Sequence, residues 1–152
     1  MEKYLKILYN FIYLHASSRD CEDILQDTLL AAWQGLQTQT VSSLKPWLIG
    51  IARHKVLDRF RTAYRAEFFD IENYESLLIE KDEIETLIAR LDLAEALKIL
   101  NNQEAELVFM VYAAGLSYTE ISAITGVPVG TIKSRIYSIK SKLRKKLSGG
   151  TL

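Results

Sequence analysis

The sequence predicts an all-α protein: two small helical lobes joined by an acidic linker, the C-terminal lobe being a four-helix helix-turn-helix domain. Leu, Ile, Ala, Lys and Glu dominate its 152 residues, and these residue types favour helices. Only two prolines occur, Pro46 and Pro128, and no run of alternating β-branched residues predicts a strand. The third observation is the distribution of charge along the chain.

Two basic ends flank an acidic middle, although the net charge is zero. Residues 1–65 carry nine basic and six acidic side chains, residues 66–106 carry three and twelve, and residues 107–152 carry seven and one. We therefore expect domains at 1–66 and 83–148, with an acidic linker at 67–82. Such asymmetry suggests contact with a polyanion at two places, although ordinary solvated helix faces explain the charges equally well.

Three helices are expected in the first lobe, over residues 3–16, 20–36 and 46–65. Asp20 is the expected N-cap of the second helix. That helix has a series of residues spaced for burial: Leu25, Thr28, Leu29, Ala32, Trp33 and Leu36. The polar segment Gln37–Leu44 has no helical period and predicts an exposed loop, after which Pro46 opens the third helix.

The third helix carries two opposite stripes. One is apolar and suited to burial: Ile49, Ala52, Val56, Phe60 and Tyr64. The other combines an aromatic residue with mostly charged ones: Trp47, His54, Asp58, Arg61 and Arg65. An aromatic ring near basic side chains can stack on an unpaired base while the cations hold the backbone. A packing role for Trp47 is the more common alternative.

Four helices are expected in the second lobe, over 83–100, 103–114, 118–125 and 129–147. Gly115 is a suitable residue to end the second of them. From Gly115 to Leu147 the sequence meets the demands of helix-turn-helix geometry. Ser122 supplies the small residue where the helices cross, Gly126 supplies a turn residue that tolerates positive φ, and Ile132 points back into the lobe.

The last helix is two-sided. Its apolar stripe comprises Ile132, Ile136, Ile139, Leu143 and Leu147. Hydrogen-bonding and basic residues lie on the other side: Lys133, Ser134, Tyr137, Ser138, Ser141 and Lys145. Such a helix suits the major groove of DNA, and its first amides, near Gly130 and Thr131, suit a phosphate. The alternative is a surface helix with lysines for solubility.

Several classes of site are excluded by the sequence. His15 and His54 lie far apart, and one cysteine cannot form an internal disulfide or a cysteine-rich zinc site. Cys21 lies among acids, which raise a thiol pKa, so it is expected to be inert. No phosphate-binding or nucleophile motif occurs, and we expect no enzyme, metal or cofactor.

No apolar run approaches the roughly 20 residues that cross a bilayer, so no direct membrane insertion is expected. The apolar start of the chain lacks a small-residue cleavage site and is better explained as an amphipathic helix than as a signal peptide. The lone cysteine fits a cytoplasmic protein.

Two motifs resemble one family. The segments DCEDILQDTLLAAW and KPWLIGIARHKVLDRFR resemble region 2 of extracytoplasmic-function (ECF) sigma factors, and GLSYTEISAITGVPVGTIKSRI resembles their region 4. The resemblance covers about residues 8–147. The order of the motifs and the acidic spacer are also similar to that family.

This resemblance implies three sets of site residues. The surface that binds core RNA polymerase would comprise Asp23, Gln26, Asp27 and Leu30. The loop Gln37–Leu44 would help to read the −10 element together with Trp47, Arg53, His54, Lys55 and Arg61. The −35 element would be read by Lys133, Ser134, Arg135, Tyr137 and Ser138, with Thr119 and Thr131 near phosphates. His54 stands where many members carry Asn, and Ser138 stands where a basic residue is common.

The resemblance also implies partners: core RNA polymerase, promoter DNA and an anti-sigma factor, with the free protein a monomer. One alternative is a stand-alone helix-turn-helix regulator, in which residues 1–65 form a dimerisation lobe. Another is an adaptor that binds polymerase without reading DNA.

Overall fold

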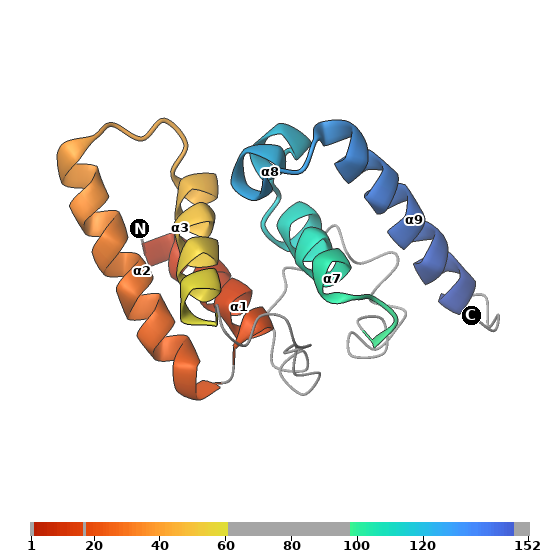
Figure 1. The fold of residues 1–152 in the computed structure, drawn as a ribbon, viewed down its shortest axis with the longest axis horizontal. Coiled ribbons are helices and arrows are strands. Elements are labelled where there is room, and N and C mark those ends of the chain that lie inside the picture. The colour runs from red at the N-terminus through yellow and green to blue at the C-terminus, as the bar shows by residue number, and fades with distance from the viewer. Residues whose placement is uncertain (1, 17, 61–97, 148–152) are drawn as a thin grey trace.

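The computed structural model describes residues 2–16, 18–60 and 98–147, and all regular structure in these ranges is helical (Figure 1). The predicted all-α class is therefore confirmed. The first lobe contains a 3-10 turn, Glu2–Tyr4, and the helices α1 (Leu5–His15), α2 (Ser18–Thr38) and α3 (Leu44–Arg59). The second contains α7 (Asn102–Val108), a π-helical segment (Phe109–Ala113), α8 (Tyr118–Thr125) and α9 (Val129–Leu147).

Three predicted features lie outside the described residues. These are the acidic linker at 67–82, nearly all of the helix expected over 83–100, and the end of the helix expected over 46–65, including Arg61.

The N-terminal lobe is a three-helix unit in which α1 packs against both α2 and α3. Its core is almost free of solvent exposure and includes Leu8, Phe11, Ile12, Ile24 and Leu48. Each such side chain contributes about 1.5–3 kcal/mol by leaving water. The apolar stripe predicted for the third helix is confirmed over its described part, since Ile49, Ala52 and Val56 are buried and Phe60 is half-buried against the core.

The second helix differs from its prediction in two respects. It begins at Ser18, so Asp20 lies inside the first turn instead of capping it, and its carboxylate accepts a hydrogen bond from Arg59 at 3.1 Å. Trp33 and Leu36 are 60% and 41% exposed, so their predicted burial was wrong. The helix packs through a narrower stripe, whose buried members are Cys21, Ile24, Thr28 and Ala32.

The loop before α3 is shorter than expected. Gln37 and Thr38 still belong to α2, and Leu44 already belongs to α3, which leaves residues 39–43 as the connection. Pro46 lies in the first turn of α3, where its missing N–H costs no helical hydrogen bond.

The helix-turn-helix prediction is confirmed in its local details. Ser117 and Glu120 form a capping box at the start of α8, with hydrogen bonds of 3.0 and 2.9 Å. Gly126 ends α8 at φ 79°, the left-handed conformation that a glycine adopts without steric cost. Ile132, Ile136, Ile139 and Leu143 are buried, as their spacing predicts, and the side chain of Leu147 is not described.

The two lobes lie side by side along the long axis of the molecule (Figure 1). The helices α2 and α9 form the two outer edges, whereas α3 lies in the middle and contacts α8. The aromatic rings of Phe11 and Phe109 meet between the lobes, with centroids 5.9 Å apart. The helix α3 is thus covered on one side by the second lobe, while α2 and α9 each keep an outward face.

Candidate nucleic-acid interface

The outward face of α9 carries a row of exposed side chains. Lys133, Ser134 and Ser138 are exposed, and Tyr137 retains 75% of its accessible surface. The buried isoleucines on the opposite side fix the rotation of the helix, so that these donors point to solvent together. Thr119 is exposed in the first turn of α8, and Thr131 is half-buried in the first turn of α9.

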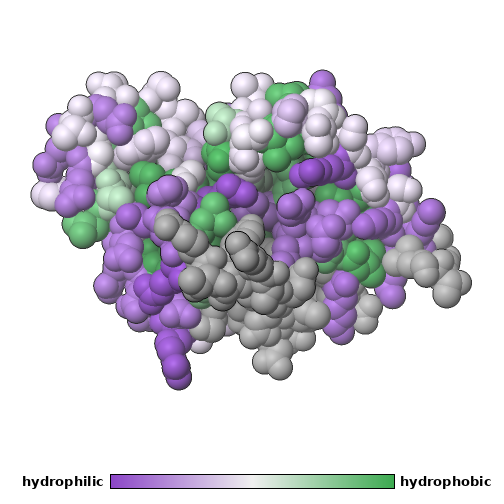
Figure 2. All heavy atoms as spheres, viewed as in Figure 1, coloured by the Kyte–Doolittle hydropathy of each residue, from purple (hydrophilic) through white to green (hydrophobic). Residues whose placement is uncertain are grey.

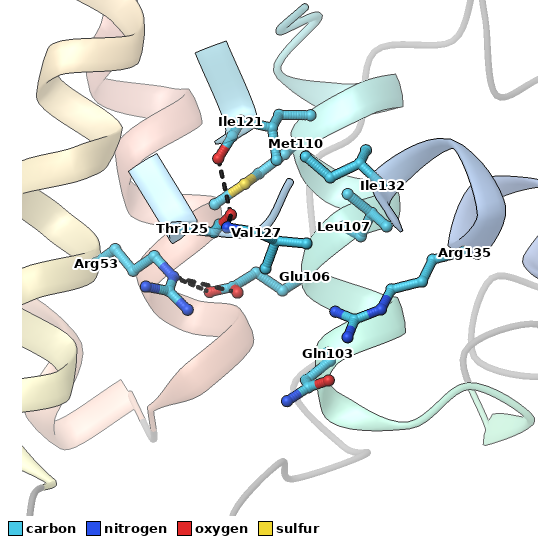
Figure 3. Close-up of a pocket in the computed structure, with 10 residues that line it drawn as sticks. All are labelled: Arg53, Gln103, Glu106, Leu107, Met110, Ile121, Thr125, Val127, Ile132 and Arg135. Atoms are coloured by element: carbon cyan, nitrogen blue, oxygen red, sulfur yellow. Dashed lines mark hydrogen bonds and ion pairs between the residues drawn. The ribbon is translucent and has the colours of Figure 1, made fainter. Parts of the chain in front are cut away.

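The side chain of Arg135 points in a different direction from this row of exposed side chains on α9. It lines a small cavity, of about 80 Å³, that lies between the lobes. In Figure 3 its guanidinium extends toward the side of α7 that carries Gln103 and Glu106. The seven residues expected at the −35 element are therefore brought to one region of the lobe, but Arg135 lies away from the Lys133 face.

Trp47 is half-buried near the start of α3, and its ring lies against α2. A Cβ atom placed on Gly35 would lie 2.8 Å from Cζ2 of Trp47, so this close approach requires a glycine. Gly35 was not among the predicted site residues. A signal for it did exist, because a glycine inside a helix costs about 1 kcal/mol relative to alanine and needs a reason to be there.

A groove of about 710 Å³ brings three of the expected −10 residues together. Trp47, His54 and Lys55 line it from α3, and Glu120, Ala123 and Ile124 line it from α8. Figure 2 shows a notch at the upper edge of the molecule between the lobes. His54 itself is 73% exposed at its side chain and lies 3.4 Å from the carboxylate of Asp58. One wall of this groove is thus supplied by the second lobe.

Arg53 does not line that groove and is engaged by the other lobe. Its Nε donates to both carboxylate oxygens of Glu106, at 3.2 Å each (Figure 3). His15 Nε2 lies 3.0 Å from Oε2 of the same carboxylate. Glu106 comes from α7, whereas its two partners come from α1 and α3. This buried cluster was not predicted.

Glu106 keeps a charge in a buried position, with only 9% of its surface exposed. Burial alone would raise the pKa of its carboxyl group, but the hydrogen bonds and charges of His15 and Arg53 outweigh burial and hold the pKa below 4.5, its usual value. The sequence did contain a signal, since an acid stands between Ala105 and Leu107 in an apolar run.

The outward face of α2 combines acidic, amide and apolar groups. Asp23, Gln26 and Asp27 are exposed, and so are Leu30, at 55%, and Trp33, at 60%. Asp23 accepts a hydrogen bond from Arg59 at 3.2 Å, and together with Asp20 it raises the pKa of that guanidinium. Exposed leucine and tryptophan side chains in one row mark a surface suited to a protein partner.

The described residues include no group of three or more His, Cys, Asp or Glu side chains arranged to hold a metal ion. Cys21 is fully buried, and burial, more than the neighbouring charge of Glu22, raises the pKa of its thiol to about 11. Among the helices of the described ranges, none is long and apolar enough to cross a membrane.

Comparison with known families matches each lobe to one of them. Residues 1–66 match sigma-70 region 2, and residues 83–143 match sigma-70 region 4. Together the two matches cover most of the chain, in the order expected from the two sequence motifs.

Individual relatives agree with these matches. The ECF RNA polymerase sigma factor EcfG of Rhodopseudomonas palustris is 33% identical over 87% of this chain and 74% of its own. SigL of Mycobacterium tuberculosis, also an ECF RNA polymerase sigma factor, is 26% identical over 96% of this chain and 85% of its own. The fold is similar to that of the sigma factor RpoE from Bartonella quintana, solved with the anti-sigma factor NepR, at 27% identity and a TM-score of 0.66, covering 97% of this chain and 95% of that one. The chain therefore belongs to the ECF family of sigma-70 factors, alternative sigma factors that direct RNA polymerase to specific promoters.

Proposed function

We propose that this sigma factor works through three separate surfaces, one for core RNA polymerase and two for promoter DNA. The observation that carries the proposal is the pair of outward faces on α2 and α9, which lie at opposite ends of the molecule (Figure 1). One presents apolar and acidic groups, and the other presents donors and a cation. Their different chemistry suits a protein and a nucleic acid, respectively.

The proposed polymerase surface comprises Asp23, Gln26, Asp27 and Leu30, extended by Trp33. An exposed tryptophan in a row with leucine and flanking acids has the composition of an interaction hot spot with a polar surround. The ion pair between Arg59 and Asp23 must compete with any partner that uses this carboxylate.

The proposed −35 surface is the face of α9 that carries Lys133, Ser134, Tyr137 and Ser138, together with Arg135, whose side chain points away from this face, and with Thr119 and Thr131 near phosphates. A basic helix face reads base edges in the major groove while the phosphate contacts fix its register. The proposed domains are residues 1–66 and 83–148, joined by the linker at 67–82.

The proposed −10 surface lies on α3, where Trp47, His54 and Lys55 line one groove and Arg53 lies beside them. Stacking an unpaired base on Trp47 would offset part of the cost of opening the duplex, a few kcal/mol per base. Arg61 and the connection 39–43 would also contribute. In this account the polymerase performs the chemistry, and the sigma factor catalyses nothing and works in the cytoplasm.

An anti-sigma factor is proposed as a further partner. The similar sigma factor RpoE of Bartonella quintana was solved in complex with the anti-sigma factor NepR. A protein of that class would regulate access to the surfaces described here.

A pair of matched aromatic substitutions tests the assignment of the two outer faces. Trp33→Ser should weaken binding to core RNA polymerase by about tenfold or more, because it removes an anchor of the α2 face. Tyr137→Ser, at an exposed aromatic residue of the other lobe, should leave core binding unchanged and weaken promoter binding by the assembled holoenzyme. Titration of labelled protein with core enzyme, followed by promoter-fragment binding, measures both effects. The reverse pattern would contradict the assignment.

A further inference from the structure

We propose that Glu106, Arg53 and His15 form an interlobe latch, which holds the free protein closed and keeps Arg53 from nucleic acid until the lobes separate. The inference rests on the proposed function in one respect, namely that Arg53 belongs to the −10 surface. The latch itself depends only on contacts between the lobes.

The three side chains lie at the contact between the two lobes, one of which matches sigma-70 region 2 and the other sigma-70 region 4. Residues 1–66 contribute His15 and Arg53, and residues 83–143 contribute Glu106. The guanidinium of Arg53 is directed at Glu106, with Nε equidistant, at 3.2 Å, from both oxygens (Figure 3). An arginine in this arrangement cannot bind a phosphate at the same time through the same N–H group.

Burial makes the cluster specific to the closed form. His15 and Glu106 have side chains only 7% and 12% exposed, and the side chain of Arg53 is 21% exposed. A charge in such a place is tolerated because its opposite charge lies beside it. The latch requires that water replaces the lost partners at all three groups when the lobes separate.

This chemistry suits a contact that must open. Beside the apolar contact of Phe11 with Phe109, the cluster gives the interface a charged part that water solvates after separation, since hydrated ions are stable in water. In the closed form, by contrast, removal of one partner destabilises the contact between the lobes, because it leaves the remaining charges buried and uncompensated. The groove lined by Trp47 and Ile124 shows that the lobes do not seal against each other along their whole contact.

The same closure affects the rest of the proposed −10 surface. Trp47, His54 and Lys55 share their groove with Glu120, Ala123 and Ile124 of α8, so a strand of DNA would meet the second lobe there. Closing the lobes therefore engages Arg53 and narrows access to its neighbours in one movement. Opening the lobes releases Arg53 and widens access to these neighbours.

Glu106→Gln provides the test, with Glu104→Gln as its matched control. Both changes remove one negative charge from α7, but Glu104 pairs with Lys142 of α9 inside the second lobe, at 2.9 Å. Glutamine also preserves the capping box that Glu104 forms with Asn101. The control thus loses an ion pair within a lobe and keeps the latch between lobes.

Lobe separation is measured on the full chain by single-molecule energy transfer between dyes at the exposed positions Glu22→Cys and Arg144→Cys. Cys21 needs no replacement because its thiol is buried, with a pKa of about 11. Glu106→Gln should lower the ratio of closed to open molecules by at least about tenfold and produce a low-transfer population. Glu104→Gln should give the distribution of the unaltered protein. Identical distributions for the unaltered protein and Glu106→Gln would overturn the latch.

A second variant guards against a folding defect, which circular dichroism would reveal. Arg53→Gln breaks the cluster from the first lobe and should open the molecule in the same way. A closed distribution in this variant would also overturn the latch.

A second readout separates the latch from the function of Arg53. A fluorescein-labelled single-stranded oligonucleotide of mixed sequence should bind Glu106→Gln more tightly than the unaltered protein, by about the factor lost from the closed form, and Glu104→Gln no more tightly. If the molecule opens without gaining affinity, the latch stands as a structural contact. In that case its control of DNA access is refuted, together with the role of Arg53 at the −10 surface.

Discussion

Glu106 carries its charge inside an otherwise apolar stretch of α7, and the surrounding groups explain why it stays ionised. His15 comes from α1 and Arg53 from α3. The pKa of Glu106 is lowered because these favourable contacts outweigh the effect of burial. A lowered pKa in the folded state means that ionisation stabilises this state.

The stability of the protein should therefore depend on pH through this residue. The contribution is complete above the ordinary pKa of 4.5 and is lost as the pH falls through the lower value in the folded protein. We expect the difference in unfolding free energy between the unaltered protein and Glu106→Gln to be largest near neutral pH and to shrink below about pH 4.5. Urea unfolding across this range measures it. A difference that remains constant down to about pH 3 would contradict the assigned cause.

Residue positions in the candidate site were predictable where one helix determines them. The exposure of Lys133, Ser134, Tyr137 and Ser138 follows from the spacing of the buried isoleucines on the same helix. The engagement of Arg53 by Glu106 joins residues 53 positions apart, and no periodicity encodes such a pair. Trp33 was misassigned because an apolar side chain is equally suited to a core and to a partner surface.

Gly35 of α2 lies against the ring of Trp47 from α3, and this contact leads to a prediction about how the two helices pack. In an ordinary helix, Gly→Ala stabilises by roughly 0.5–1 kcal/mol. At Gly35 the new methyl group would meet the ring of Trp47 at 2.8 Å, which forces the ring or the helices apart. We expect Gly35→Ala to lower the unfolding free energy and to shift the fluorescence of Trp47, the other tryptophan being replaced by phenylalanine.

Gly130→Ala is the matched control for this prediction. Gly130 also lies in a helix, but nothing lies within 4 Å of the position of its Cβ, so the ordinary gain in helix stability should appear. If both variants gained stability, the contact between Trp47 and Gly35 would not constrain α2 and α3.

Helix boundaries were predictable where the residues at the helix ends act as caps. The start of α8 at a serine followed by glutamate three residues later, and its end at Gly126, are local signals that the structure confirms. The start of α2 and the length of the following loop were less accurate. Asp20 pairs with Arg59 of another helix, and Gln37 and Thr38 extend α2 although their sequence is polar and loop-like.

The whole molecule places its three proposed surfaces in different environments. The faces of α2 and α9 point outward at opposite ends, whereas the face of α3 meets the second lobe (Figure 1). The sequence predicted two lobes from the alternation of charge, but it held no information on how they meet. Contact between the lobes joins side chains distant in sequence, among them Phe11 with Phe109 and Arg53 with Glu106.

Run-off transcription with purified core RNA polymerase and a promoter library, with and without this protein, tests the central claim most directly. The account predicts specific transcripts that appear only when the protein is present, and their start sites give the −35 and −10 sequences that it reads. If the polymerase stayed silent while the protein alone bound duplex DNA tightly, a stand-alone helix-turn-helix regulator would replace the sigma factor assignment.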